Sequence, residues 1–261
     1  MKRYLRLYLS FLKFSLTNKL QFQFDFALKI IMDAVFYLVN FGVYKTIYAH
    51  APSFGGLTEH QAMIFVGTFI TVDALYMCFF SANMWFLPQH INSGGLDFYL
   101  LRPVNSQFFL SFREFAWDSF VNFAMAFGFL SYQMLSLDDL VVWKVPIYFM
   151  ALICGTYLNY LIQMLFLIPA FWTGSPRGFS SLNWTLQEFN EKPDRIFRGP
   201  LRFALLTILP FSLLASVPVR VLFESNPWSL LFHVMGITIL FHVFIKWFWS
   251  KGLKVYASAS S

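Results

Sequence analysis

Charged residues are scarce in this sequence, and their scarcity excludes most classes of soluble protein. Of its 261 residues, 12% are charged and 58% are hydrophobic. An average soluble domain is about 25% charged and about 45–50% apolar. A soluble domain of this size could not bury so much apolar surface, so the composition predicts an integral membrane protein.

Cysteines and catalytic motifs are also nearly absent. The two cysteines, Cys78 and Cys154, lie in apolar runs and give neither a disulfide framework nor metal-ligand spacing. No Walker A, G-x-S-x-G or H-E-x-x-H motif occurs, and the five histidines are scattered. No basic face with groove-reading elements is visible, so nucleic-acid binding is not expected. The sequence predicts a chain that is not an enzyme and has no metal site.

Long apolar runs are abundant and predict an all-α protein with six transmembrane helices. A helix that crosses a bilayer needs about 20 mostly apolar residues. An outer-membrane barrel would instead show alternating polar and apolar positions. The predicted spans, which together form a transmembrane domain over 24–249, are 24–48, 61–85, 115–135, 143–172, 201–222 and 228–249.

The basic residues predict the orientation of these spans. Of the 19 Lys and Arg residues, fifteen fall in the N-terminal segment, in the second-to-third and fourth-to-fifth connections, or at the C-terminal end. The other connections hold only Lys45, Lys144 and Arg220. Because cytoplasmic loops are enriched in Lys and Arg, both termini are expected in the cytoplasm, with the protein in a bacterial inner membrane. Residues 250–261 then form a cytoplasmic tail.

The first 23 residues are predicted to form an amphipathic helix on the cytoplasmic membrane surface. Their polar residues recur at spacings of three and four, which places them on one helical face: Arg3, Arg6, Ser10, Lys13 and Thr17. Apolar residues fill the remaining face, as in interfacial helices. No signal-peptide cleavage site is recognisable. The helix serves either as a simple anchor or also as a contact for a partner.

Four charged residues are expected at membrane depth. Asp25, Lys29 and Asp33 lie at i, i+4 and i+8 of the first span, and Asp73 lies near the middle of the second. Such groups could form a coupling-ion or proton relay, because they are costly in a bilayer and face protein or water. The favoured interpretation is structural, with Lys29 neutralising Asp25, Asp33 or, across helices, Asp73.

The connections carry most of the remaining information. Residues 86–107 hold a short helix candidate, a Gly94-Gly95 break and an apolar stretch closed by Arg102-Pro103. This segment would be a plain linker in a solitary transporter and a docking element in a subunit driven by a soluble motor. Residues 173–199 form the longest polar stretch and are expected to be a cytoplasmic loop that could dock another protein. Pro210 and Pro218 interrupt the fifth span and predict an irregular outer region over 210–227, either a kinked helix or a re-entrant element.

At these residues the sequence resembles the transmembrane subunits of ABC exporters of the ABC-2 type, in a bacterial subfamily whose substrates are mostly unassigned. The resemblance covers nearly the whole chain. It is carried by the basic amphipathic start and by four further pieces: G-x-L-D-x-x-L-L-x-P-V at 94–104, F-x-G-P-L-R at 197–202, the spacing of Pro210 and Pro218, and the run from Lys251 to Ser258.

The resemblance implies six helices and a dimer, often a heterodimer with a sister permease, with two ABC ATPase subunits beneath that hold ATP and Mg²⁺. It implies that the 86–107 segment is the coupling element and that the substrate path follows the dimer interface. The substrate itself, a small molecule or a lipid, stays open. A self-contained secondary transporter or channel, or a non-transporting scaffold subunit, are the alternatives. The expected docking residues are Gln89, His90, Asp97, Arg102 and Val104.

Overall fold

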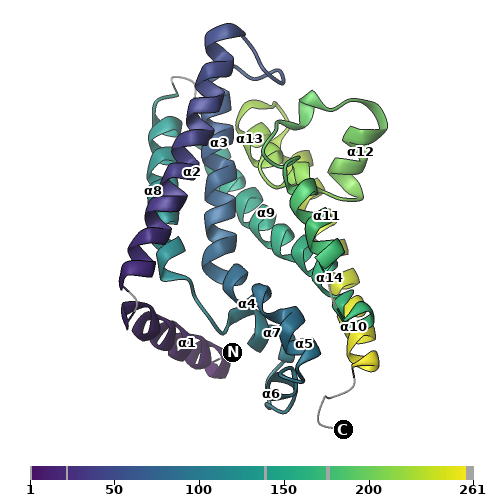
Figure 1. Cartoon of the computed structure of the whole chain (residues 1–261). Helices are drawn as coiled ribbons and strands as arrows, with labels where there is room; N and C mark the ends of the chain where they lie inside the picture. Colours follow the sequence, from purple (N-terminus) through teal and green to yellow (C-terminus); the bar gives the residue numbers. More distant parts are fainter. Residues whose placement is uncertain (1, 22, 138–139, 175–176, 257–261) are drawn as a thin grey trace.

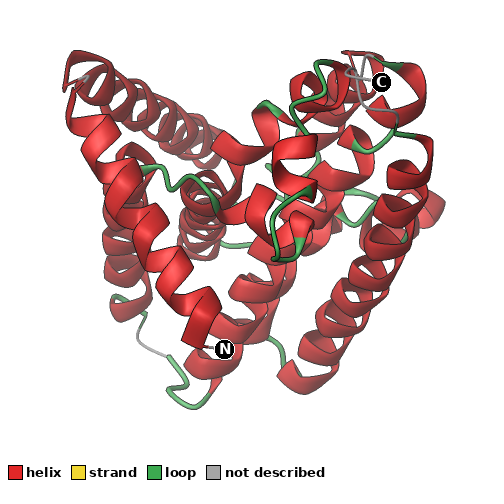
Figure 2. Cartoon of the chain, turned by 90° about the horizontal axis from the view of Figure 1, so that it is seen from below, coloured by secondary structure: helices red, strands yellow, loops and turns green. Residues whose placement is uncertain are grey.

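Helices joined by short loops make up the chain in a computed structural model (Figures 1 and 2), which describes residues 2–21, 23–137, 140–174 and 177–256. Within these ranges no strand forms beyond an isolated bridge between Phe54 and Leu57. Parts of three predicted segments lie outside the described residues: Met1 and Phe22 of the N-terminal helix, Ser175 and Pro176 of the polar loop, and 257–261 of the tail.

The molecule has two opposite ends, which are named here by the segments that lie there. Helix α1 (Lys2–Gln21) and the last turns of α14 (Pro227–Val255) lie at the same end, called here the terminal end (Figure 1). The opposite end, where the loop 51–58 lies, is called the distal end. Figure 2, viewed from the terminal end, shows α1 in the foreground.

Four helical segments are long and apolar enough to cross a membrane. They match the first, second, fourth and sixth predicted spans, and are Phe24–His50, Glu59–Asn92, Lys144–Thr173 and Pro227–Val255. The first segment is α2 (Gln23–His50), and the last is α14. The second joins α3 (Glu59–Tyr76), a π-helical turn η1 (Met77–Ser81), α4 (Ala82–Trp85) and α5 (Leu87–Asn92). The third joins α9 (Lys144–Leu167) and α10 (Ala170–Thr173).

The predicted third span corresponds to α8 (Trp117–Leu135), which follows α6 (Asp97–Leu100) and α7 (Ser106–Phe112). With 19 residues α8 is nearly long enough to span a bilayer, but it carries Asp118, Asn122 and Gln133 and is not among the four apolar segments. It packs closely on α3, where a Cβ on Gly67 would lie 3.3 Å from the Phe129 ring. The count of six spans therefore stays a prediction.

The predicted fifth span is not one continuous helix. It divides into α12 (Gly199–Thr207), a 3-10 turn η3 (Phe211–Leu213) and α13 (Ser216–Phe223). Pro210 lies in the break before η3, as expected of a residue that cannot continue a helix. Pro218, in contrast, is the third residue of α13, where the backbone N–H has no helical partner to lose. The prediction that Pro218 breaks a helix is therefore wrong.

This broken segment descends along α9 and returns. The carbonyl oxygen of Leu214 approaches Gly155 so closely that a Cβ there would lie 2.6 Å from it. Gly155 lies 11 residues beyond Lys144, about 17 Å along the helix. At the start of α9, Lys144 Nζ donates hydrogen bonds to the carbonyl oxygens of Leu222 (3.2 Å) and Glu224 (2.7 Å). The chain thus reaches the middle of α9 and comes back to the distal end.

The expectation of a loop on one face over 173–199 is wrong. Helix α11 (Arg177–Gln187) runs beside α9, and its Asn183 Nδ2 donates to Gln163 Oε1 at 2.6 Å. Beyond it, the Glu191 carbonyl oxygen accepts a hydrogen bond from the Tyr44 hydroxyl near the distal end of α2. These hydrogen bonds tie the segment to α9 and to α2, so it connects the two ends of the molecule.

The path of this segment also places four basic residues at the end of the molecule opposite to the one predicted. Lys192, Arg195, Arg198 and Arg202 follow α11 and lie at the distal end, where the sequence placed only three. The bias of positive charge toward the terminal end is therefore weaker than expected, and a cytoplasmic terminal end stays a prediction.

The core is formed by α3, α9 and α13, whose side chains are mostly buried. Helix α2 contrasts with them, since Tyr37 and Tyr44 are its buried residues among the described side chains. Many of its other apolar residues, such as Ile31, Met32 and Leu38, are exposed in the isolated chain. Such a helix can be solvated only by lipid or by another subunit.

Candidate functional site

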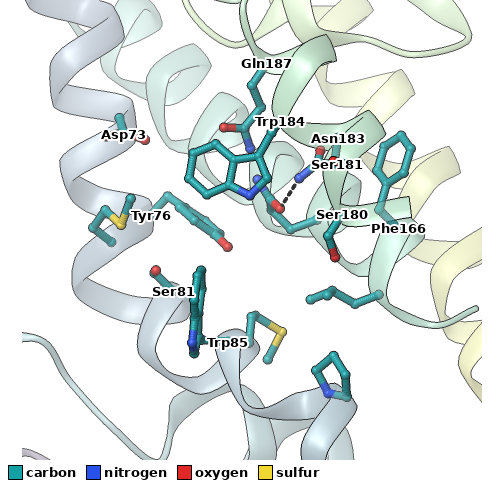
Figure 3. A pocket seen from close by; sticks show the side chains of 15 residues that line it. Asp73, Tyr76, Ser81, Trp85, Phe166, Ser180, Ser181, Asn183, Trp184 and Gln187 are labelled. Atoms are coloured by element: carbon teal, nitrogen blue, oxygen red, sulfur yellow. Dashed lines mark hydrogen bonds between the residues drawn. The ribbon is translucent and has the colours of Figure 1, made fainter. Parts of the chain in front are cut away.

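A cavity of about 540 Å³ separates the second spanning segment from α9 and α11 (Figure 3). It extends from Asp73, midway along the segment Glu59–Asn92, to Pro88 of α5 near the terminal end. The described residues that line it are apolar and polar side chains together with one carboxylate, and none of them is Lys, Arg or His: Asp73, Tyr76, Met77, Ser81, Met84, Trp85, Pro88, Gln163, Phe166, Leu167, Ser180, Ser181, Asn183, Trp184 and Gln187.

Asp73 is the charged group of this cavity. Among the described residues none forms a hydrogen bond or an ion pair with its carboxylate, which is partly exposed to the cavity. The nearest other charges that act on it are the carboxylates of Asp33 and Glu191. The expected pairing of Asp73 with Lys29 is therefore absent from the structure.

Aromatic rings and unsatisfied acceptors complete the cavity wall. The rings of Trp85 and Trp184 come from opposite sides and are 70% and 60% exposed. Asn183 is buried, and its Oδ1 has no hydrogen-bond partner among the described residues, although its Nδ2 is bound to Gln163. The cavity thus offers ring faces and hydrogen-bond acceptors.

The π-helical turn η1 shapes this wall and was not expected from the sequence. A π turn leaves one carbonyl out of the α-helical ladder; here the Cys78 carbonyl oxygen accepts from the Ala116 amide at 3.0 Å. Asn83 then binds both backbone groups of Glu114, donating to its oxygen (2.7 Å) and accepting from its nitrogen (2.8 Å). The link between α7 and α8 is thereby fastened to the cavity wall.

The other membrane-depth charges lie apart from the cavity, between α2 and α8. Lys29 Nζ lies 2.9 Å from Asp25 Oδ2 and 4.0 Å from Asp118 Oδ2. Asp33 Oδ2 accepts a hydrogen bond from Asn122 Nδ2. Asp118, which is buried, was missed because it stands in the first turn of its helix, where an acid also serves to cap.

The expected coupling residues form a compact element at the terminal end. Gly94, with φ of 76°, makes the sharp turn between α5 and α6. Tyr99 is the centre of the element, since its hydroxyl lies 3.2 Å from His90 Nε2 and accepts from Arg113 Nη1 at 2.9 Å. His90 therefore braces the element internally rather than facing outward.

The remaining expected docking residues are more accessible. Gln89 and Arg102 are exposed, and the Arg102 guanidinium lies 4.6 Å from the Phe98 ring centre. Asp97 is half-buried beside Tyr256, which follows α14; burial first and the Asp97 carboxylate second raise the pKa of Tyr256. Val104 is half-buried.

Helix α1 packs against the same element. The rings of Tyr4 and Phe108 lie 4.9 Å apart, and the Tyr4 hydroxyl accepts from the Asn105 amide at 3.4 Å. The polar residues predicted to share a face are exposed where their side chains are described, as is a separate apolar stripe. The stripe consists of Leu5, Leu9 and Leu16.

At the distal end an ion-pair network holds the broken segment. Asp194, in a 3-10 turn η2 (Asp194–Ile196), is 2% exposed, and its Oδ2 lies 2.6 Å from Arg202 Nη2 and 3.1 Å from Arg220 Nη1. Glu224 Oε1 accepts from Arg220 Nε (2.7 Å) and Arg195 Nη2 (2.8 Å). Burial opposes ionisation of Glu224, but these hydrogen bonds and charges outweigh it and hold its pKa below the usual value.

Comparison with known proteins adds a family. Residues 18–260 match the family described as "ABC-2 family transporter protein". No curated protein and no solved structure gives a match. In the part of the chain that the structure describes, no group of three or more His, Cys, Asp or Glu residues is placed to hold a metal ion.

Proposed function

Because the chain belongs to the ABC-2 transporter family, we propose that it is the membrane-embedded, passive subunit of an ATP-driven exporter. As a permease component of an ABC transporter it is a multi-pass membrane protein. In this proposal ATP and Mg²⁺ are bound by two partner ATPases, and this chain contributes the path. The bacterial inner membrane is its location, with the terminal end in the cytoplasm.

The observation that carries the proposal is the α5–α6 element at the terminal end. It is too short to span a bilayer, yet it is braced from several directions by Tyr99, Arg113 and the residue after α14. Its outer surface carries Leu101, which is 83% exposed, next to Arg102. A rigid element with an exposed apolar and charged tip suits transmission of force from a soluble partner.

The same element is linked to the cavity. Helices α6 and α7 continue into Glu114 and Ala116, which are bound to Asn83 and to the π turn beside the cavity. At its other side the cavity is lined by Phe166, whose ring centre lies 6.5 Å from that of Phe211 at the tip of the re-entrant segment. Movement of the α5–α6 element would therefore act on the cavity, and the Phe166–Phe211 contact would link the cavity wall to the broken segment.

A second permease subunit belongs to the proposal, either a copy of this chain or a sister chain in a heterodimer. Its support is the exposed apolar surface of α2. Nucleotide-dependent closure of the ATPases would shift the population of the membrane dimer between states open to one side or the other.

The test is purification of the tagged full-length chain from its native membrane, followed by mass spectrometry of the chains that accompany it. We expect an ABC ATPase, and ATP-dependent accumulation of substrate in vesicles that contain the complex. Arg198→Glu reverses a charge at the distal end and should retain the ATPase. It is the control for a charge reversal in the α5–α6 element. Isolation of the chain alone, together with transport that needs no nucleotide, would favour a self-contained transporter.

A further inference from the structure

We infer that the cavity at Asp73 binds a bulky organic cation, such as a protonated aromatic or alkyl amine, and that the exported substrate belongs to this class. The binding site stands on the geometry of this chain. Its role in transport rests on the proposed function.

The first argument is charge. A carboxylate inside a membrane protein is costly unless a cation or water accompanies it. The structure supplies Asp194 with two guanidinium groups and Asp25 and Asp118 with Lys29, but it supplies no such partner to Asp73 from the described residues. The described side chains of the cavity lining add no basic group, and Asp33 and Glu191 increase the negative potential. The missing positive charge is therefore expected on the ligand.

The hydrogen-bonding groups of the cavity also favour a positively charged ligand over an anionic one. The buried Oδ1 of Asn183 is an acceptor without a donor among the described residues. This oxygen is enclosed by protein, so the carboxylate of Asp73 is the acceptor that the cavity offers to an ammonium group. An anionic ligand would find no cationic group among the described lining residues to neutralise it.

Aromatic walls and size define the rest of the ligand. Trp85 and Trp184 face the cavity from α4 and α11, and Tyr76 stands between them and Asp73 (Figure 3). Ring faces attract cations by about 0.5–2 kcal/mol per favourable contact. A volume of about 540 Å³ is within the usual range for small-molecule sites. A coupling proton or a bare metal ion would need neither the rings nor this volume.

The position of the cavity fits loading from the terminal side. Pro88 and Asp73 are 15 residues apart, which corresponds to a rise of about 22 Å along a helix. A cation that enters near α5 can thus pass the tryptophans and reach the carboxylate.

The experiment uses a pair of probes that share shape and differ in charge, tetraphenylphosphonium and tetraphenylborate. Binding to the full-length chain in lipid nanodiscs is measured by equilibrium dialysis, with empty nanodiscs subtracted to remove partition into lipid. We expect saturable binding of the cation, at least about tenfold tighter than that of the anion. Asp73→Asn should weaken cation binding about tenfold and leave anion binding unchanged. Asp25→Asn is the control, because it removes a carboxylate outside the cavity, and should bind as the wild type does.

Equal binding of the two probes, or unchanged cation binding by Asp73→Asn, would overturn the inference. If Asp73→Asn does not give a monodisperse protein, Trp184→Ala decides instead, because its largely exposed side chain can be removed without loss of core packing. That variant should weaken cation binding about threefold or more; no change would count against the site. The measurement needs no ATPase, so its failure and a failure of the proposed partnership are seen separately.

Discussion

Two aspartates within this chain, Asp194 and Asp73, lie in contrasting surroundings. Asp194 lies in a short 3-10 turn at the distal end and is held by Arg202 and Arg220. Asp73 lies in the long helix α3 and faces a cavity whose described lining residues carry no positive charge. The first carboxylate is committed to the fold, whereas the second is available to a ligand.

The difference follows from the backbone around them. Helix α3 satisfies its own backbone groups, so it needs no side-chain partner to keep its shape. The segment from η2 to α13 changes direction several times and has few regular hydrogen bonds, and charged side chains fix its turns.

The largest effect is expected from reversing the charge of Asp97 in the α5–α6 element, where the ATPase is proposed to dock. Asp97→Arg should abolish transport and substrate-stimulated ATPase activity, because it places a positive charge at the tip of the α5–α6 element. The permease should still be inserted in the membrane at normal abundance. Vesicle transport, ATPase assays and immunoblots of membranes measure the three quantities. Normal stimulation of the ATPase would remove Asp97 from the docking surface.

Removing the carboxylate of Asp194 at the distal end should instead lower the stability of the fold. Asp194→Asn leaves Arg202 without its carboxylate and Arg220 with Glu224 alone, and breaking a buried pair costs about 3–5 kcal/mol. We expect early loss of the monodisperse peak in thermal denaturation followed by size-exclusion chromatography. Asp73→Asn is the comparison and should melt close to the wild type. Equal melting of the two variants would erase the distinction between the aspartates.

Lys29→Met tests the committed pairs between α2 and α8. Asp118 is buried, and loss of Lys29 removes a cation that it shares with Asp25. We expect reduced abundance and assembly in membranes, from a loss of about 1–3 kcal/mol. A variant that assembles normally and loses only pH-dependent activity would instead support a relay through these charges.

The smallest effect concerns Glu224. Its folded pKa is lowered, so its ionised form adds stability above the unfolded pKa of about 4.3, and this contribution is lost as the pH falls further. Denaturation between pH 6 and pH 3.5 should show a steeper loss of stability for the wild type than for Glu224→Gln. The difference should be about 1 kcal/mol or less, because the pair is partly exposed. Identical slopes would mean that the ion pairs of Glu224 add nothing.

Long apolar runs in the sequence were enough to find four spanning segments. The Gly94–Val104 pattern and similar short pieces were enough to find the family. Both signals are local in the sequence. Helix α11 was missed because it is short and contains several polar residues, which resemble a loop until Gln163 is known to face Asn183. The presence of Asp73 was noticed, but its surroundings were not, because the cavity is built from segments about 100 residues apart in sequence. Pairings such as Lys29 with Asp118 are non-local in the same way.

The π turn at Met77–Ser81 has one further consequence. A π turn is an α-helix with one residue too many, and each residue turns the helix by about 100° and advances it by about 1.5 Å. Five residues of a π turn rotate the chain by nearly the same angle as four residues of an α-helix, so the turn takes up its extra residue and Met84 and Trp85 keep their direction. Deleting Phe79 would restore a plain helix, and the Cys78 carbonyl oxygen would return to the helical ladder and no longer accept from Ala116. A single residue of chain length therefore decides whether the link before α8 is fastened to this helix.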